Sequence, residues 1–165
     1  MVRPVPDSVR PGQESVWDYP RPPRVERVPK RVQIDFGGIR IVDTDDVVRV
    51  LETSHPPVYY LPVAAFGDAL TLGQGASFCE FKGGARYFDV HGGGGVVAER
   101  AAWNYPSPMP GYEVLADRVA VYAAAMDRCI VAGETVRPQP GGFYGGWVTD
   151  DVAGPFKGIP GSMGW

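Results

Sequence analysis

The chain has 165 residues, of which 44% are hydrophobic and 21% charged, and its formal net charge is -3. This length favours one domain with a core of ordinary size, and the acidic balance argues against a nucleic-acid-binding protein. No apolar run approaches the roughly 20 residues of a membrane span and the start does not resemble a signal peptide, so we expect a cytoplasmic protein without membrane partners.

Two cysteines, Cys79 and Cys129, lie fifty residues apart. Two thiols at this distance do not make a disulfide framework, and the chain shows no Cys-x-x-Cys or paired histidine spacing of a zinc site. In a reducing compartment both thiols are expected to be free. The sequence therefore predicts no metal site, and it names no cofactor.

Residues 1–30 form a first segment, an arm with seven prolines. Because proline lacks the ladder donor, we expect extended chain without regular structure of its own. Val16, Trp17 and Tyr19 are the residues that would attach the arm to the body. The arm is basic and the rest of the chain is acidic, so it either stays solvated, folds back on the body or contacts a neighbouring subunit.

The body is predicted over residues 31–139. Arg31 to Val42 alternates on each side of Gly37-Gly38, which is typical of a β-hairpin. Asp43 or Thr44 is suited to cap a short helix over Asp45–Glu52.

Further along the body, apolar stretches between glycines and prolines predict more strands. Between Val114 and Met126 the alanine run keeps helix as an alternative. The elements expected are strands at Val58–Leu61, Phe78–Lys82, Tyr87–His91, Val96–Trp103, Val119–Ala123 and Cys129–Ala132, a plain turn at Gly92–Gly95, and one or two helical turns at Tyr112–Asp117. This pattern predicts a mainly β domain, a compact antiparallel β-barrel or sandwich with one or two short helices.

Residues 140–165 form a second arm, with eight glycines among aromatic residues. Phe143, Tyr144, Trp147, Phe156 and Trp165 make it too apolar for a plain flexible tail. We therefore expect this arm to wrap the body or a partner subunit.

Several spaced motifs resemble one bacterial family. They are Arg31-Val32, Tyr59-Tyr60-Leu61-Pro62, Cys79-Glu80-Phe81-Lys82-Gly83 followed by Tyr87, Trp103-Asn104-Tyr105-Pro106-Ser107-Pro108, and Val119-Ala120-Val121-Tyr122. Over about residues 28–135 the chain resembles domain of unknown function 427 (DUF427), a family also labelled nucleotidyltransferase-like. The resemblance implies a compact β-rich fold and a cytoplasmic bacterial protein, and it carries no settled activity. Glu80 departs from the family, whose members usually have proline after the cysteine.

The segment Ser77–Tyr87 holds the candidate ligand-binding residues. Lys82 is one of three lysines beside thirteen arginines, and because ammonium and guanidinium groups are not interchangeable, its retention indicates a need for a compact amine. The alternative is an ion pair with Glu80, worth little if exposed. Gly83 and Gly84 would turn backbone amides toward an anion, and Arg86 would add a bidentate contact.

Aromatic residues supply the remaining wall of this predicted site. Tyr87, Trp103 and Tyr105 would form an apolar surface for the ligand; the alternative is that Trp103 and Tyr105 simply cap the core. A second Phe-Lys-Gly segment, at Phe156–Gly158, holds another of the lysines. The sequence leaves open whether the two segments meet.

Possible chemistry would use Cys79 as nucleophile, with Glu80 or His91 moving protons. Strand alternation places Glu80 and Lys82 with Phe78 on one face, and Cys79 with Phe81 on the other. The alternative is therefore a buried, inert Cys79. Surface or loop positions are the default for both histidines.

Two functions follow from these residues. The first is a protein that binds a small anionic or nucleotide-like ligand, with possible transferase-type chemistry. The second is a non-catalytic binding or assembly module whose two arms clasp neighbouring subunits of a homo-oligomer. A homo-oligomer is expected in either case, and the small-molecule partner is not identified.

Overall fold

The computed structural model describes residues 3–165, and the first predicted element, the hairpin, is present. β3 (Val32–Phe36) and β4 (Ile39–Thr44) pair antiparallel around Gly37-Gly38. β3 buries every second residue, as its alternating sequence requires. The hairpin joins β11 (Arg128–Val131) and β12 (Glu134–Thr135) in a four-stranded sheet of order β12-β11-β3-β4.

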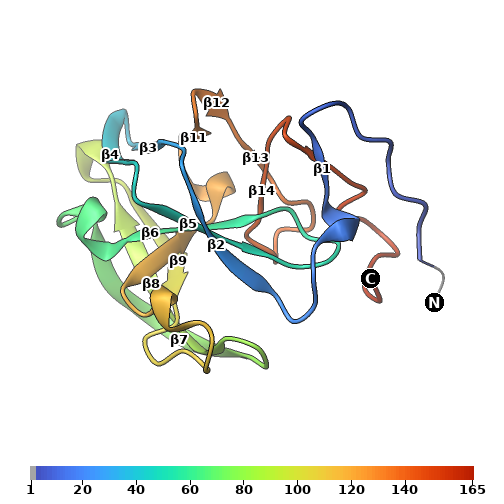
Figure 1. Cartoon of the computed structure of the whole chain (residues 1–165). Helices are drawn as coiled ribbons and strands as arrows, with labels where there is room; N and C mark the ends of the chain where they lie inside the picture. The colour runs from blue at the N-terminus through green and yellow to red at the C-terminus, as the bar shows by residue number, and fades with distance from the viewer. Residues whose placement is uncertain (1–2) are drawn as a thin grey trace.

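A larger sheet faces this hairpin. It has seven strands in the order β2-β5-β6-β10-β9-β8-β7, and each neighbouring pair is antiparallel. In chain order its strands are β2 (Arg24–Val28), β5 (Val47–Leu51), β6 (Val58–Pro62), β7 (Leu70–Cys79), β8 (Gly83–His91), β9 (Val97–Asn104) and β10 (Arg118–Val121). Figure 1 shows the two sheets around the main core.

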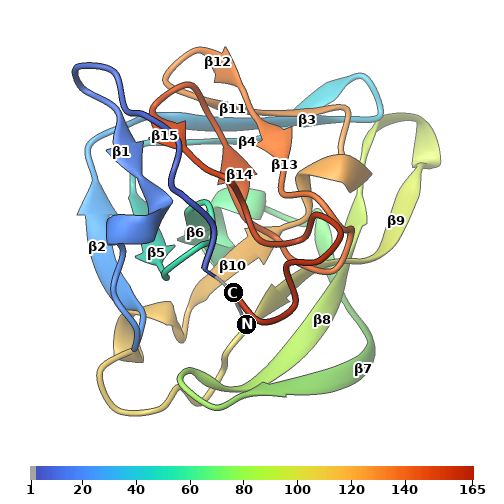
Figure 2. The same ribbon diagram turned by 90° about the vertical axis from the view of Figure 1, so that its right-hand side faces the viewer.

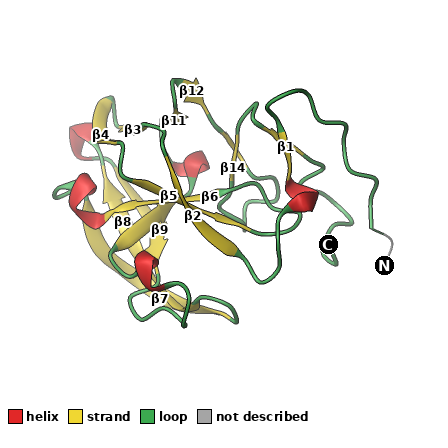
Figure 3. Cartoon of the chain, in the orientation of Figure 1, coloured by secondary structure: helices red, strands yellow, loops and turns green. Residues whose placement is uncertain are grey.

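The main core draws residues from both sheets. Ile34, Val42 and Cys129 come from the smaller sheet, and Leu61 and Val119 from the larger one. Within residues 3–165 the sheets do not close into a barrel, so the sandwich-like form of the predicted mainly β fold is confirmed. The helical segments are short 3-10 turns of three or four residues (Figure 3), and none of the helices in this part of the chain has the length and apolarity to cross a bilayer.

Several smaller predictions are also met. The predicted strands at 58–61, 87–91, 96–103, 119–123 and 129–132 appear as β6, β8, β9, β10 and β11, with some bounds shifted. η3 (Gly93–Gly95) is the predicted glycine turn between β8 and β9, and η4 (Glu113–Leu115) is the predicted helical turn. The alanine run forms only the short turn η5 (Ala123–Ala125), so the longer helix is not found.

The predicted helix over Asp45–Glu52 is wrong, because this stretch contains β5. Val47 packs in the main core, Val48 and Val50 in a second cluster, and Leu51 in a third. A strand that is covered on both faces loses the polar-apolar alternation that identifies a strand from its sequence.

Two further expectations are corrected at the edges of the large sheet. Residues 24–28 of the first arm are not free of regular structure, because they form β2 and pair with β5. The strand predicted at Phe78–Lys82 is the last part of the long edge strand β7 and the turn after it. The earlier part of β7 is rich in glycine and polar residues and largely exposed, so its sequence lacks an apolar face.

The two arms lie side by side on the chain's own body, as Figures 1 and 2 show. β1 (Glu14–Ser15) pairs in parallel with β15 (Val152–Ala153). η1 (Val16–Asp18) follows β1, and its Trp17 donates from Nε1 to the Pro155 carbonyl at 3.0 Å and packs edge-on against Trp165 at 5.4 Å between ring centroids. These contacts join the two arms to each other within one chain.

Trp147 anchors the second arm in the main core. It begins β14 (Trp147–Val148), which pairs with β13 (Arg137–Pro138). Its side chain is 1% exposed and stacks on Tyr59 at 5.2 Å between centroids. Its Nε1 donates to the Val121 carbonyl at 3.0 Å. The second arm is thus part of the core that joins the two sheets.

The first prediction is that Trp147→Ala lowers the free energy of unfolding by about 3–5 kcal/mol, because it removes a large buried ring and leaves a cavity. The measurement is chemical denaturation. Phe143→Ala in the same arm is the control; its side chain is 76% exposed, so a change within about 0.5 kcal/mol is expected. Equal effects of the two substitutions would show that the arm does not share the core.

Candidate functional site

A cavity of about 340 Å³ lies where the β7–β8 hairpin faces the β5–β6 turn and the second arm. We call it the lysine cavity, because both Phe-Lys-Gly segments contribute their lysine to it. The residues that line it are Val50, Glu52, His55, Val58, Tyr60, Ser77, Phe78, Cys79, Lys82, Tyr87, Trp103, Tyr105, Tyr122, Gln139, Phe143, Tyr144, Gly145 and Lys157. Two segments that are 75 residues apart in the sequence therefore meet in one site.

Lys82 is held in the turn after β7. Its carbonyl accepts from the Met109 amide at 2.9 Å, and its side chain, in a residue only 9% exposed, places Nζ 5.6 Å from the centre of the Tyr105 ring. Gly83 follows with φ at 109°, a conformation that favours glycine. Ammonium over an aromatic face is a stabilising contact, and it keeps the charge inside the cavity.

Lys157 is held in nearly the same manner from the second arm. Its amide donates to the Ser54 carbonyl at 2.9 Å, and its Nζ lies 5.7 Å from the centre of the Tyr144 ring. The Nζ also donates to the main-chain oxygen of Trp165 at 3.1 Å. Gly158 follows with φ at 118°, so both lysines precede a glycine in a conformation that other residues rarely adopt.

Aromatic rings form much of the cavity wall. Trp103 and Tyr122 are 4.5 Å apart between ring centroids, and Tyr60 and Tyr105 are buried beside them. Burial raises the pKa of Tyr105 well above its usual value, so its phenol stays uncharged. Trp103 and Tyr105 belong to a core cluster and also line the cavity, so core packing does not exclude them from the cavity wall.

Glu52 and His55 lie on the β5–β6 side of the cavity. Arg21, from the first arm, makes an ion pair with Glu52 at 3.2 Å. His55 Nε2 lies 3.7 Å from the same Glu52 oxygen, and the His55 ring packs edge-on against Tyr144 at 5.0 Å. The Gln139 side-chain nitrogen is 3.0 Å from His55 Nδ1.

His55 lies in the loop between β5 and β6, one of the two positions expected for it, but its side chain is only 13% exposed. Burial lowers its pKa to about 4, and the positive charges of Lys157, Arg21 and Lys82 act in the same direction against the opposing effect of Glu52. At neutral pH the imidazole is therefore uncharged.

Cys79 lines the lysine cavity and is half-buried at the end of β7. The strand ends at Cys79, so the alternation predicted to continue to Lys82 is broken by the turn. Lys82 lies on the cavity side with Cys79, whereas Glu80 is exposed. The predicted common face of Phe78, Glu80 and Lys82 is therefore wrong.

The structure brings together five of the predicted site residues, which are Cys79, Lys82, Tyr87, Trp103 and Tyr105. The other predicted residues do not line the cavity. Glu80 points to solvent, and His91 lies in a different hollow, where its Nε2 is 2.7 Å from Thr71 Oγ1. The proton transfer proposed between these groups and Cys79 has no support in this geometry.

The predicted anion contacts beside Lys82 also have other roles. Arg86 Nε donates to the Asn104 side chain at 3.0 Å, on the strand next to it. Gly83 and Gly84 continue the antiparallel ladder opposite Cys79 and Phe78. Gly83 also lets the 107–109 loop lie against the hairpin, because a side chain there would meet the Ser107 carbonyl at 3.3 Å.

Sequence reasoning did not include Glu52, His55, Gln139 or Lys157 in the site. The repeated Phe-Lys-Gly pattern was a usable signal for Lys157. His55 had none, because its partners come from residues 139 and 157, far along the chain. In residues 3–165 no group of three or more His, Cys, Asp or Glu side chains is arranged to hold a metal.

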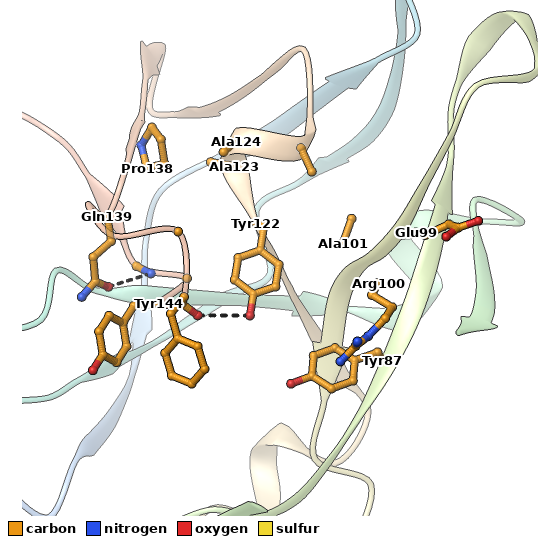
Figure 4. A pocket seen from close by; sticks show the side chains of 15 residues that line it. Tyr87, Glu99, Arg100, Ala101, Tyr122, Ala123, Ala124, Pro138, Gln139 and Tyr144 are labelled. Carbon is orange, nitrogen blue, oxygen red and sulfur yellow. Dashed lines mark hydrogen bonds between the residues drawn. The ribbon is translucent and has the colours of Figure 1, made fainter. Parts of the chain in front are cut away.

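A second hollow of about 630 Å³ adjoins the lysine cavity, and we call it the arginine hollow. Figure 4 shows Tyr122 between Tyr144 on one side and Tyr87 with Arg100 on the other. The Tyr122 hydroxyl donates to the Phe143 carbonyl at 3.3 Å, and the Arg100 guanidinium lies 4.6 Å from the Tyr87 ring centre. Tyr87, Tyr122 and the 143–145 segment therefore separate two neighbouring concave surfaces.

We predict that one thiol of the native protein reacts with an aromatic disulfide reagent and that it is Cys79. Cys129 is 1% exposed, and burial raises its pKa to about 12, so it should react only after unfolding. Counting reacted thiols in the native and denatured protein tests this. If the native Cys79→Ala variant still reacts, the reactive thiol is not Cys79 and the prediction is wrong.

A further prediction concerns stability against pH. Because the pKa of His55 is lowered in the folded chain, the unfolded chain binds a proton first as the pH falls from 6.5 toward 4. The stabilisation is complete above pH 6.5, and roughly 3 kcal/mol is lost by about pH 4. Denaturation across this range should show a smaller loss in His55→Gln than in the parent or in His91→Gln. An unchanged slope in His55→Gln would contradict the assignment.

Comparison with known proteins adds a family. The chain matches the model described as domain of unknown function (DUF427) over residues 24–132, from β2 to just after β11. A search of the curated proteins finds no match. The matched part contains the whole seven-stranded sheet, the four-stranded sheet except β12, and Lys82, while Gln139 and Lys157 lie after it. Because the match covers more than half of the chain, the protein belongs to the DUF427 family.

Proposed function

We propose that this protein binds a small anionic, nucleotide-like ligand in the lysine cavity. The observation that carries the proposal is that two of the three lysines line one cavity and neither has an Asp or Glu carboxylate at ion-pair distance within residues 3–165. Lys30, in contrast, pairs with Asp151 at 2.6 Å. Lys157 Nζ donates one hydrogen to the Trp165 main-chain oxygen, which leaves it two. Two ammonium groups without a carboxylate side chain beside them favour an anion that would complete their interactions.

The remaining charged groups of the cavity also favour a negatively charged ligand. Glu52 is the carboxylate among the lining residues, and Arg21 already offsets its charge from outside the lining. His55 is uncharged at neutral pH because burial lowers its pKa. The cavity therefore presents a net positive field to a ligand, which raises its local concentration and its affinity if it is anionic.

The shape and walls of the cavity support a ligand with a flat ring. A volume of about 340 Å³ lies at the lower end of the range of roughly 300–1,000 Å³ that is typical of small-molecule sites. Trp103, Tyr105 and Tyr122 offer aromatic surface, on which a ring would stack. A compact ring that carries an acidic group satisfies both the walls and the lysines.

Transferase-type chemistry is the second part of this proposal, and it has one support. Cys79 is the thiol that lines the cavity, so a bound ligand would lie near a nucleophile. The alternative function, an assembly module whose arms clasp other subunits, has less support because Trp17, Trp147 and Trp165 contact the chain's own body. A bacterial, cytoplasmic protein remains the prediction that accompanies either function.

We predict that phenyl phosphate, an anion with one ring, raises the melting temperature of the parent protein, because a ligand that binds only the folded state stabilises it. Lys82→Met and Lys157→Met should each weaken binding by about tenfold or more, since each removes a charge-assisted contact. Lys30→Met is the matched control and should bind as the parent does. Equal protection of the parent and Lys82→Met would contradict Lys82 as an anchor.

A further inference from the structure

The orientation of the Gln139 side chain is fixed by two backbone groups. Its Oε1 accepts from the Gly146 amide at 3.0 Å, and its Nε2 donates to the Lys157 carbonyl at 2.9 Å. An amide N–H can only donate and a carbonyl can only accept, so the reverse orientation would face both groups with the wrong atom. Gln139 is 3% exposed, which makes such a mismatch costly.

This orientation decides the protonation of His55. One hydrogen of Gln139 Nε2 goes to Lys157, and the other faces His55 Nδ1 at 3.0 Å. Nδ1 must therefore be the acceptor and carry no proton. A neutral imidazole has one N–H, so the proton of His55 is on Nε2, the nitrogen on the Glu52 side.

We propose that His55 presents Nε2–H to the ligand as an uncharged hydrogen-bond donor, so that the lysine cavity selects oxyanions that only accept hydrogen bonds, such as a phosphate dianion. This rests on the proposed function, since Lys82 and Lys157 supply the charge. All three groups are donors, and none accepts a proton from the ligand in this state. Glu52 is the carboxylate of the lining and already pairs with Arg21. A dianion offers only acceptor atoms and a larger charge, so it gains more from the three donors than a monoanion that carries one proton.

The groups around His55 keep it neutral. Glu52 faces Nε2 but is paired with Arg21, and Lys157 and Lys82 oppose a positive charge on the ring. Tyr144 packs edge-on against the ring, and Gln139 occupies Nδ1. Between pH 5.5 and 7.5 the charge of His55 therefore stays constant, and a change in affinity over this range would come from the ligand.

The test uses the intact protein with ¹⁵N-labelled histidine. The chain has only two histidines, and His91→Gln assigns their signals. We expect Nδ1 of His55 unprotonated and Nε2 protonated from pH 7.5 to 5.5, with the Nε2 signal moving on addition of phenyl phosphate. A protonated Nδ1, or a cationic ring at pH 5.5, would overturn the inference without any change to the residues of the cavity.

Ligand charge gives an independent measurement. The second ionisation of a phosphate ester lies near pH 6, so phenyl phosphate should bind several-fold more tightly at pH 7.5 than at 5.5. Benzenesulfonate is fully ionised throughout and should bind equally at both. Sulfonate binding that weakens as the pH rises would indicate a cationic His55 and contradict the proposal.

A variant separates this inference from the proposed function. His55→Phe keeps a ring against Tyr144 but removes the donor, and phenyl phosphate should bind about tenfold more weakly. If His55→Phe binds as the parent does while Lys82→Met does not, the anion site stands and the role of His55 is wrong. If phenyl phosphate neither protects the parent nor moves any signal, the proposed function fails and the ligand role of His55 fails with it.

Discussion

The side-chain amide of Gln139 is the interaction on which the geometry of the site depends. It satisfies the backbone of Gly146 and of Lys157 and still has one hydrogen for His55. Each of these groups is costly to leave unpaired at this depth. The amide thus fixes the 139–146 loop, the strand-like segment at Lys157 and the state of the imidazole together, so that one buried group sets both the shape and the donor pattern of the cavity.

The positive charge on the β5–β6 side of the cavity comes from the arms and not from the two large sheets. Arg21 comes from the first arm and Lys157 from the second. Between them, Ser54 receives the Lys157 amide on its carbonyl and donates its own amide to Val16. The arms therefore hold the β5–β6 turn on both sides, and the positive charge of this wall comes from the two folded ends of the chain. A family match over residues 24–132 therefore leaves both Arg21 and Lys157 outside it.

Period-two alternation predicts a strand from its sequence where one face of the strand is exposed to solvent. β3 and β4 alternate around two glycines, and their hairpin was evident from that pattern. β5 could not be identified in this way, because four of its five residues are apolar and pack in core clusters on both faces of the strand. β2 was missed for another reason: it lies in a proline-rich segment that does not suggest a strand, although it extends the large sheet.

The candidate site, too, could be predicted from the sequence only in part. Lys82 could be singled out because lysine is scarce in this chain, and composition can be read without knowledge of contacts. Lys82 does line a cavity in the structure. The predicted directions of the side chains next to Lys82 were wrong. Side chains alternate between the two faces only within a strand, and β7 ends at Cys79. The role of His55 depends on a buried amide 84 residues later. The protonation state of His55 depends on tertiary packing, and no local pattern of residues around position 55 indicates it.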